Sequence, residues 1–188
     1  FYYIVLFAIY CFIGWVLEVF YRSFKQRKFV NAGFIFGPFV PIYGIGAFIV
    51  IVLQYFIQNW HFIPRYAALG LSITFVEYIV GFLAEKIFKI PLWNYSDRRF
   101  NLHGRVCLLF SLLWTVLAVV FSEFIHPEVF SRVASLQEGF VKPAAIAFMI
   151  YFWVDYTFSV MSLASFRNAV AHLYEEYFNL SNTEIEES

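Results

Sequence analysis

Residues 34–57 read FIFGPFVPIYGIGAFIVIVLQYFI, a run of 24 residues without one charged side chain. A helix needs about 20 mainly apolar residues to cross the ~30 Å hydrocarbon core of a bilayer. Four further apolar runs, with at most one charged residue each, lie at residues 1–21, 66–84, 106–122 and 143–166. The runs are continuously apolar rather than alternating, which favours helices, because a helix satisfies its own backbone polar groups in lipid. The sequence therefore predicts an all-α integral membrane bundle of five transmembrane helices.

The composition supports this interpretation. Of the 188 residues, 62% are hydrophobic and only 14% are charged, whereas soluble domains are about 45–50% apolar and about 25% charged. So few charges do not cover a water-facing surface, which disfavours a soluble enzyme or a disordered chain. Thirteen basic and thirteen acidic residues cancel, so no net charge indicates a nucleic-acid partner. The expected surroundings are membrane lipids.

The chain divides into a transmembrane domain, residues 1–166, and a short acidic tail, residues 167–188. In the tail, apolar residues recur at helical spacing, which favours contact with the membrane surface; these are Val170, Leu173, Tyr174 and Tyr177. Residues 27–33 and 98–104 share two basic residues, a Phe, an Asn and a Gly. One hypothesis is that the first two pairs of helices form a parallel repeat with the fifth helix extra. Chance similarity is the alternative.

The basic residues predict an orientation. Ten of the thirteen Lys and Arg residues flank one side of the predicted helices, namely the first and third loops and the start of the tail. Only Arg65, Arg132 and Lys142 lie on the other side. Cytoplasmic loops carry an excess of Lys and Arg. We therefore expect a multi-pass protein of the cell membrane with its N-terminus outside and its C-terminus in the cytoplasm.

Prolines and glycines gather where the second apolar run begins. Pro38 and Pro41 lie among Gly33, Gly37 and Gly44. This pattern predicts irregular backbone near membrane depth, which survives only when it is buried in protein or lines a wet cavity. A simple loop that leads into the second helix is the alternative.

Three acids interrupt the apolar runs, and each follows an aromatic residue and a valine: Glu18, Glu77 and Asp155. A carboxylate at the centre of a membrane helix costs about 2.5–3.5 kcal/mol on insertion scales. Such residues usually face the interior of the bundle and mark ion, proton or substrate sites. We expect the three carboxylates to face one shared polar cavity and to bind a ligand there.

The third loop, residues 93–105, reads WNYSDRRFNLHGR and is rich in side chains that hold phosphate or carboxylate groups. Arg105 begins an apolar helix, and we expect it to turn inward toward Glu77 or Glu18. Asn101, Arg105 and the segment 38–43 would then close the cavity on its cytoplasmic side. The candidate ligand-binding residues are Glu18, Tyr43, Glu77, Asp97, Asn101, His103, Arg105 and Asp155.

The sequence contains no motif of a known catalytic or ATP-binding site. Neither GxxxxGK[ST] nor GxSxG occurs, and no HExxH pair of metal ligands is found. We therefore assign no catalytic residue, no metal site and no cofactor, and we leave enzymatic activity open. Cys11 and Cys107 lie in or beside apolar runs, far apart in sequence, and are expected to be buried small hydrophobic residues.

A set of short motifs runs in order through roughly residues 5–165. The motifs are Gly14-Trp15 with Glu18, Arg27-Lys28-Phe29-Val30-Asn31-Ala32-Gly33-Phe34, Gly37-Pro38, Pro41-Ile42-Tyr43-Gly44, Glu77-Tyr78, Trp93-Asn94-Tyr95-Ser96 and Phe100-Asn101-Leu102-His103-Gly104-Arg105-Val106-Cys107-Leu108. As a set they resemble the family labelled "putative ABC-transporter type IV", also called CmpB-like. The resemblance implies a membrane subunit of a transporter. It brings no substrate, catalytic residue or ATPase contact.

Three functional hypotheses follow. The first is a transport or solute-binding membrane component, which would work with a separate ATPase subunit. The second is a membrane enzyme or binding protein that acts on phospholipid-type headgroups, with Arg98, Arg99, His103 and Arg105 on the phosphate and Glu77 or Asp97 as a general base. The third is a structural scaffold in which acids and arginines only lock helices together. The substrate and the oligomeric state stay open.

Overall fold

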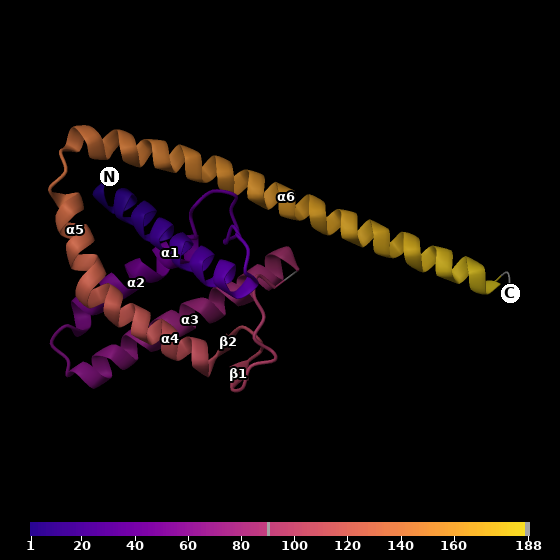
Figure 1. Cartoon of the computed structure of the whole chain (residues 1–188), viewed down its shortest axis with the longest axis horizontal. Coiled ribbons are helices and arrows are strands. Elements are labelled where there is room, and N and C mark those ends of the chain that lie inside the picture. The colour runs from indigo at the N-terminus through magenta and orange to yellow at the C-terminus, as the bar shows by residue number, and fades with distance from the viewer. Residues whose placement is uncertain (90, 187–188) are drawn as a thin grey trace.

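The computed structural model describes residues 1–89 and 91–186; of the residues after 166, only the side chain of residue 169 is included. The helices and strands follow one another as α1 (Tyr2–Gln26), α2 (Pro41–Ile57), α3 (Phe62–Phe88), β1 (Asn101–Leu102), β2 (Val106–Cys107), α4 (Leu108–Val120), a π-helical turn η1 (Phe121–Ile125), α5 (His126–Ala134) and α6 (Glu138–Glu186) (Figure 1). The predicted all-α membrane bundle is confirmed.

Four helical stretches are long and apolar enough to cross a membrane: Tyr2–Gln26, Phe62–Phe88, Leu108–Ala134 and Glu138–Phe166. The second predicted span is shorter than expected. Helix α2 has 17 residues, which gives a length of about 25 Å at 1.5 Å per residue. Its predicted first seven residues are not helical, because this is the segment that contains Gly37 and Pro38.

The fourth predicted helix ends later than the sequence indicated. We expected it to stop at residue 122, whereas the helical run continues to Ala134. The His126 N–H donates to the Phe121 carbonyl oxygen, five residues back, and this wider π-turn accommodates Pro127 at the start of α5. The charge of Glu123 does not end the helix, since Arg65 Nη2 lies 2.7 Å from its carboxylate.

Successive helices run back and forth and pack mainly against their neighbours in sequence. In Figure 1 the N-terminus and the turns 58–61 and 135–137 lie at one end of the bundle, and the segments 27–40 and 89–107 lie at the other. Helix α6 packs against α1. One buried apolar cluster joins α1, α2 and α5 and consists of Leu6, Tyr10, Ala47 and Val133. A second joins α2, α3 and α4 and consists of Val50, Ile57, Leu69 and Ala118.

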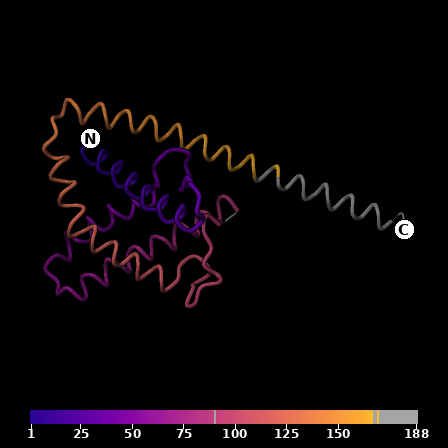
Figure 2. The backbone as a smooth tube through the Cα atoms, viewed as in Figure 1, coloured from indigo at the N-terminus to yellow at the C-terminus, as the bar shows by residue number. Residues whose placement is uncertain are grey.

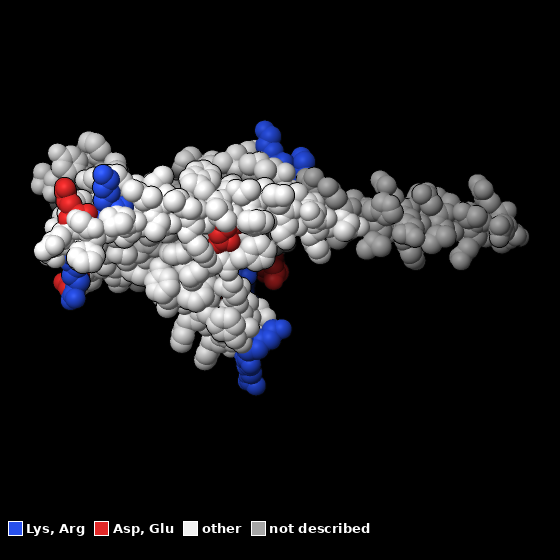
Figure 3. All heavy atoms as spheres, turned by 90° about the horizontal axis from the view of Figure 1, so that it is seen from above, with Lys and Arg blue, Asp and Glu red and all other residues white. Residues whose placement is uncertain are grey.

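The outer surface is strongly apolar. Many large hydrophobic side chains are exposed along every long helix, among them Phe20, Leu71 and Val116 at 73%, 71% and 62%. Figure 3 shows one face, on which uncharged atoms cover most of the surface and Lys and Arg lie toward the two ends of the bundle. A continuous apolar band of this size is suited to contact with lipid tails.

The segment between α1 and α2 is the irregular backbone that the prolines and glycines predicted. It folds back along α1 toward α6 (Figure 2), and Ala32, Ile35 and Val40 in it are at most 8% exposed. The Val40 N–H donates to the Cys11 carbonyl oxygen, near the middle of α1, at 3.0 Å. The non-helical backbone therefore reaches membrane depth inside the protein, where its polar groups find protein partners.

Two predictions on organisation stay predictions. The boundary at residues 166/167 falls within α6, and the side chains of Val170, Leu173, Tyr174 and Tyr177, which we expected against the membrane surface, lie outside the described residues. The two-helix repeat is likewise untested.

Candidate functional site

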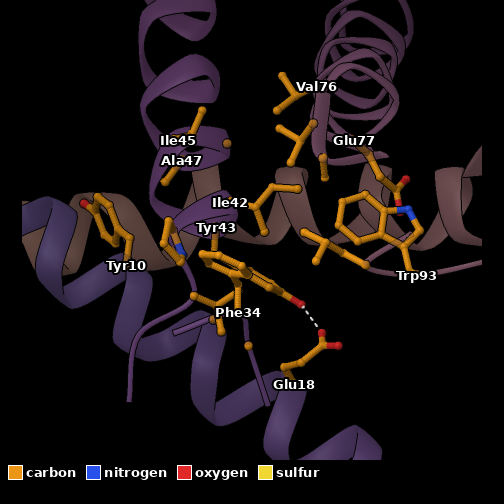
Figure 4. A pocket seen from close by; sticks show the side chains of 18 of the residues that line it. Tyr10, Glu18, Phe34, Ile42, Tyr43, Ile45, Ala47, Val76, Glu77 and Trp93 are labelled. Carbon is orange, nitrogen blue, oxygen red and sulfur yellow. Dashed lines mark hydrogen bonds between the residues drawn. The ribbon is translucent and has the colours of Figure 1, made fainter. Parts of the chain in front are cut away.

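A pocket of about 760 Å³ lies among α1, α2, α3, α4, α6 and the loop before α4. Its walls are mostly aliphatic and aromatic, which is more apolar than the polar cavity we expected. Figure 4 shows the ring of Tyr43 extending across the pocket toward Glu18, with Glu77 and Trp93 on another wall. The pocket therefore contains few polar groups, which include those of Glu18 and Glu77.

Glu18 is held by two partners. Its Oε1 accepts a hydrogen bond from Arg22 Nε at 2.8 Å, one helical turn away, and its Oε2 accepts one from the Tyr43 hydroxyl at 2.9 Å. Tyr43 approaches α1 closely because residue 14 is glycine: a Cβ there would overlap the Tyr43 ring. The Arg22 charge balances that of Glu18, so this corner of the pocket is close to neutral.

Glu77 is the least satisfied charged group of the pocket. It lies in the middle of α3 and is 3% exposed. The Tyr95 hydroxyl donates to its Oε1 at 3.1 Å, but its Oε2 is buried without a hydrogen-bond partner. Burial, followed by the nearby Glu77 charge, raises the pKa of Tyr95, so this hydroxyl stays protonated and available as a donor.

Aromatic rings surround these carboxylates. Trp93, Tyr95 and Trp114 line the pocket with Tyr43. Trp93 is fixed by a hydrogen bond from its Nε1 to the Arg105 carbonyl oxygen at 2.8 Å. Trp114 meets the Tyr43 ring edge to face at 5.4 Å, and its buried Nε1 lies near the Glu77 carboxylate but does not meet hydrogen-bond geometry with it.

One side of the pocket opens between the C-terminal half of α3 and α6. The lining residues Ile87, Trp153 and Met161 are 61%, 59% and 60% exposed. Trp153 lies in the apolar stretch of α6, so this part of the opening lies within the region that lipid would cover, whereas Ile87 lies beside Lys86 near the end of α3.

Asp155 does not share this pocket with the other two acids, contrary to our expectation. Its Oδ1 accepts the Phe36 N–H at 3.1 Å and its Oδ2 accepts the Gly37 N–H at 2.8 Å. Ser159, one turn further along α6, also accepts the Phe36 N–H, at 3.2 Å. Asp155 therefore anchors the irregular segment to α6. The apolar sequence around Asp155 does not indicate this role.

The third loop is organised by its own side chains. Asn101 Nδ2 donates to the Ser96 and Arg98 carbonyl oxygens at 3.1 and 2.8 Å, and its Oδ1 accepts the Gly104 N–H at 3.1 Å. These bonds stabilise a tight turn in which Gly104 has φ 69°. His103 Nδ1 lies 3.0 Å from the Tyr78 hydroxyl. Asn101 and His103, with the exposed Asp97, are not among the residues that line the pocket.

The expected pairing of Arg105 with Glu77 or Glu18 is wrong. Arg105 binds Glu85 on the last turns of α3, with Nη2 at 2.6 Å and Nε at 3.0 Å from the same carboxylate oxygen. Its Nη1 also donates to the Tyr78 hydroxyl at 3.2 Å. Arg105 lies at the end of the bundle, where Glu85 is within reach and the buried Glu77 is not. It is not among the pocket-lining residues, so it does not close the pocket as we expected.

The structure thus brings together Glu18, Tyr43 and Glu77 of the predicted site. Several aromatic residues of the pocket were not predicted as site residues, among them the three that lie with Tyr43 near the carboxylates: Trp93, Tyr95 and Trp114. Trp93 and Tyr95 belong to the quoted motif Trp93-Asn94-Tyr95-Ser96, which could have indicated them. Trp114 is one aromatic residue in an apolar helix and carries no such signal.

The comparison with protein families agrees with the family resemblance of the sequence motifs. The family model described as "Putative ABC-transporter type IV" matches residues 5–160, which include all the residues of the pocket except Met161. Comparisons with curated proteins and with solved structures give no match.

Proposed function

Since this chain belongs to the family described as "Putative ABC-transporter type IV", we propose that it is the solute-binding membrane component of a transport system. Its apolar helices and its family support a multi-pass membrane protein related to transport. The finer proposal is that the pocket among α1, α2, α3, α4 and α6 holds the solute. A separate ATPase subunit would supply the energy, because the sequence contains no P-loop.

The observation that carries this proposal is the state of Glu77. A carboxylate that is 3% exposed and leaves one oxygen unpartnered is costly in a membrane protein. A group that served only to join helices would have both oxygens engaged, as Asp155 has. Glu77 instead borders a pocket large enough for a small molecule. A bound solute would supply the partner that Oε2 lacks.

The headgroup hypothesis has less support. Its phosphate-binding residues Arg105 and His103 are engaged by Glu85 and Tyr78, at the end of the bundle and away from Glu77. Glu77 would not lie beside a phosphate held there, which leaves the exposed Asp97 of the loop as the only base that this hypothesis named. We therefore do not propose an enzymatic reaction.

We further propose the orientation that the basic residues indicate, with the N-terminus outside and the C-terminus in the cytoplasm. The turn that follows α1 and the segment 89–107 would then face the cytoplasm, together with Arg22 on the last turns of α1. In this orientation an ATPase subunit would meet the end of the bundle that carries the β1–β2 loop.

A pocket-blocking variant tests the proposal. Ile42 lines the pocket, and its side chain points into it in Figure 4. Native mass spectrometry of the protein released from its own membranes should show a bound small molecule, which Ile42→Trp should lose. Leu112→Trp is the matched control, since Leu112 is 57% exposed on the outer surface of α4. Equal occupancy in Ile42→Trp and wild type would place the ligand elsewhere and refute the proposal.

A further inference from the structure

We infer that the solute of this pocket is an organic cation with an apolar body, such as a hydrophobic ammonium or phosphonium. This inference rests on the proposed function and concerns the chemical class of the ligand. It follows from the charge of Glu77, the scarcity of other oxygen ligands, and the aromatic and aliphatic walls.

The charge balance of the pocket indicates a cation. Among the described residues, the ion pairs join Arg22 to Glu18, Arg65 to Glu123, Arg105 to Glu85 and Arg132 to Glu128. None of these pairs includes Glu77. A buried carboxylate needs a positive partner or a full set of hydrogen bonds. The protein gives Glu77 the Tyr95 hydroxyl, and the Trp114 indole lies near the carboxylate without completing a hydrogen bond to Oε2. A positively charged ligand next to Oε2 would supply the missing partner.

The surroundings favour an organic rather than an inorganic cation. Hard metal ions take about six or more oxygen ligands in place of their hydration shell. The Tyr95 hydroxyl is the oxygen that is hydrogen-bonded to Glu77, and the oxygens of Glu18 and Tyr43, which also line the pocket, are already engaged with each other and with Arg22. Throughout the part of the chain that the structure describes, no three His, Cys, Asp or Glu residues gather at a spacing suited to a metal ion. A bare metal ion would therefore lose more hydration than the pocket replaces.

The pocket instead offers what a large, weakly hydrated cation requires. The rings of Tyr43, Trp93, Tyr95 and Trp114 line it, and aromatic faces attract organic cations, most strongly when the cation is desolvated. The remaining walls are aliphatic and would contact the apolar body of the ligand. The opening past Ile87, Trp153 and Met161 would let such a molecule enter from the membrane, where hydrophobic cations accumulate.

Binding of tritiated tetraphenylphosphonium to the purified chain in detergent tests the inference. We expect saturable binding to wild type, and about 10-fold or greater weakening in Glu77→Gln, because the variant removes the negative charge that faces the cation where little water screens it. Glu128→Gln is the matched control, because Glu128 is exposed and pairs only with Arg132 on the surface. Equal affinity of wild type and Glu77→Gln would overturn the inference.

A second measurement uses wild type alone and so does not depend on how the variant folds. Neutral triphenylphosphine oxide should fail to displace the phosphonium at matched concentrations, whereas unlabelled tetraphenylphosphonium should displace it. Equal displacement by both compounds would show that the pocket selects apolar bulk and not charge, and would overturn the inference.

The cation could be free or part of a lipid headgroup, and nanodiscs distinguish these sources. If phosphatidylethanolamine lowers phosphonium binding more than phosphatidylglycerol does, the ammonium of a lipid headgroup occupies the pocket. If both lipids leave binding unchanged, the ligand is a free organic cation. Each result supports the class of ligand and assigns its source.

Different experimental results would refute this inference and the proposed function. A neutral or anionic molecule that is found on wild type and lost from Ile42→Trp would refute the cation and retain the solute pocket. A pocket without any bound molecule would refute both.

Discussion

The Oδ2 atom of Asp155 accepts a hydrogen bond from the backbone N–H of Gly37 at 2.8 Å. This bond joins α6 to the irregular segment between α1 and α2. A Cβ at residue 37 would overlap the Tyr151 hydroxyl and lie 2.7 Å from the same carboxylate oxygen. Gly37 and Asp155 therefore act together to hold non-helical backbone inside a membrane protein.

Replacing Asp155 by Asn should destabilise the protein. One of its two acceptor oxygens would become an NH₂ group. Facing Gly37, this group leaves a buried N–H without an acceptor, and facing Phe36 it removes one of the two acceptors of that N–H, with Ser159 as the other. We expect a loss of about 1–3 kcal/mol in the free energy of unfolding, measured by thermal unfolding in detergent. The exposed Ser162→Ala on the same helix is the control, and it should change stability little. An unchanged unfolding transition in Asp155→Asn would contradict the anchoring role.

The close approach of α1 and Tyr43 gives a second prediction. Gly14→Ala would place a methyl group in the Tyr43 ring, so the ring must move and its hydrogen bond to Glu18 should be lost. Overpacking of this kind costs about 1–3 kcal/mol, and the free energy of unfolding should fall accordingly.

A matched control is Gly139→Ala in α6, where no atom lies within 4 Å of the new Cβ. Because alanine has the higher helix propensity, this variant should be as stable as wild type or slightly more stable. If Gly14→Ala and Gly139→Ala change the free energy of unfolding equally, overlap with the Tyr43 ring does not explain the effect.

How far the fold could be predicted depends on what the residues signal locally. The long apolar runs predicted the helices, because lipid leaves the backbone few alternatives. Helix ends were harder to predict: the run through Phe121–Ile125 continues because a π-turn accommodates Pro127 and Arg65 neutralises Glu123. That ion pair spans 58 residues of sequence, and no local pattern indicates it.

The pairing of Arg105 is a third prediction. A double-mutant cycle between Arg105→Gln and Glu85→Gln should be non-additive in unfolding free energy, since the two side chains share two hydrogen bonds. The same cycle between Arg105→Gln and Glu77→Gln should be additive within error. Coupling of Arg105 to Glu77 instead would mean that the arginine turns into the pocket.

The orientation is a fourth prediction. Cysteines introduced at Asp97 and at Ser135 lie at opposite ends of the bundle, and both positions are exposed. A membrane-impermeant thiol reagent added to intact cells should label Ser135→Cys and spare Asp97→Cys. The native Cys11 and Cys107 are buried and should react little. Labelling of Asp97→Cys alone would show that the protein has the opposite orientation.

The candidate site was predictable only in part, for a similar reason. Glu18 and Glu77 were found because a charge in an apolar run is costly wherever it lies. The same signal also selected Asp155, because the sequence does not show whether a buried carboxylate is satisfied by neighbouring backbone or left for a ligand. Only the position of the Phe36 and Gly37 N–H groups separates the two cases.

An experimental structure of the protein in nanodiscs of its native lipids tests the solute pocket most directly. We predict non-protein density between the aromatic rings, with an atom within hydrogen-bond or contact distance of Glu77 Oε2. If lipid tails alone occupy the pocket and the Trp114 indole N–H donates to Glu77 Oε2, the carboxylate is satisfied by the protein. That result would contradict the assignment of Glu77 to a ligand.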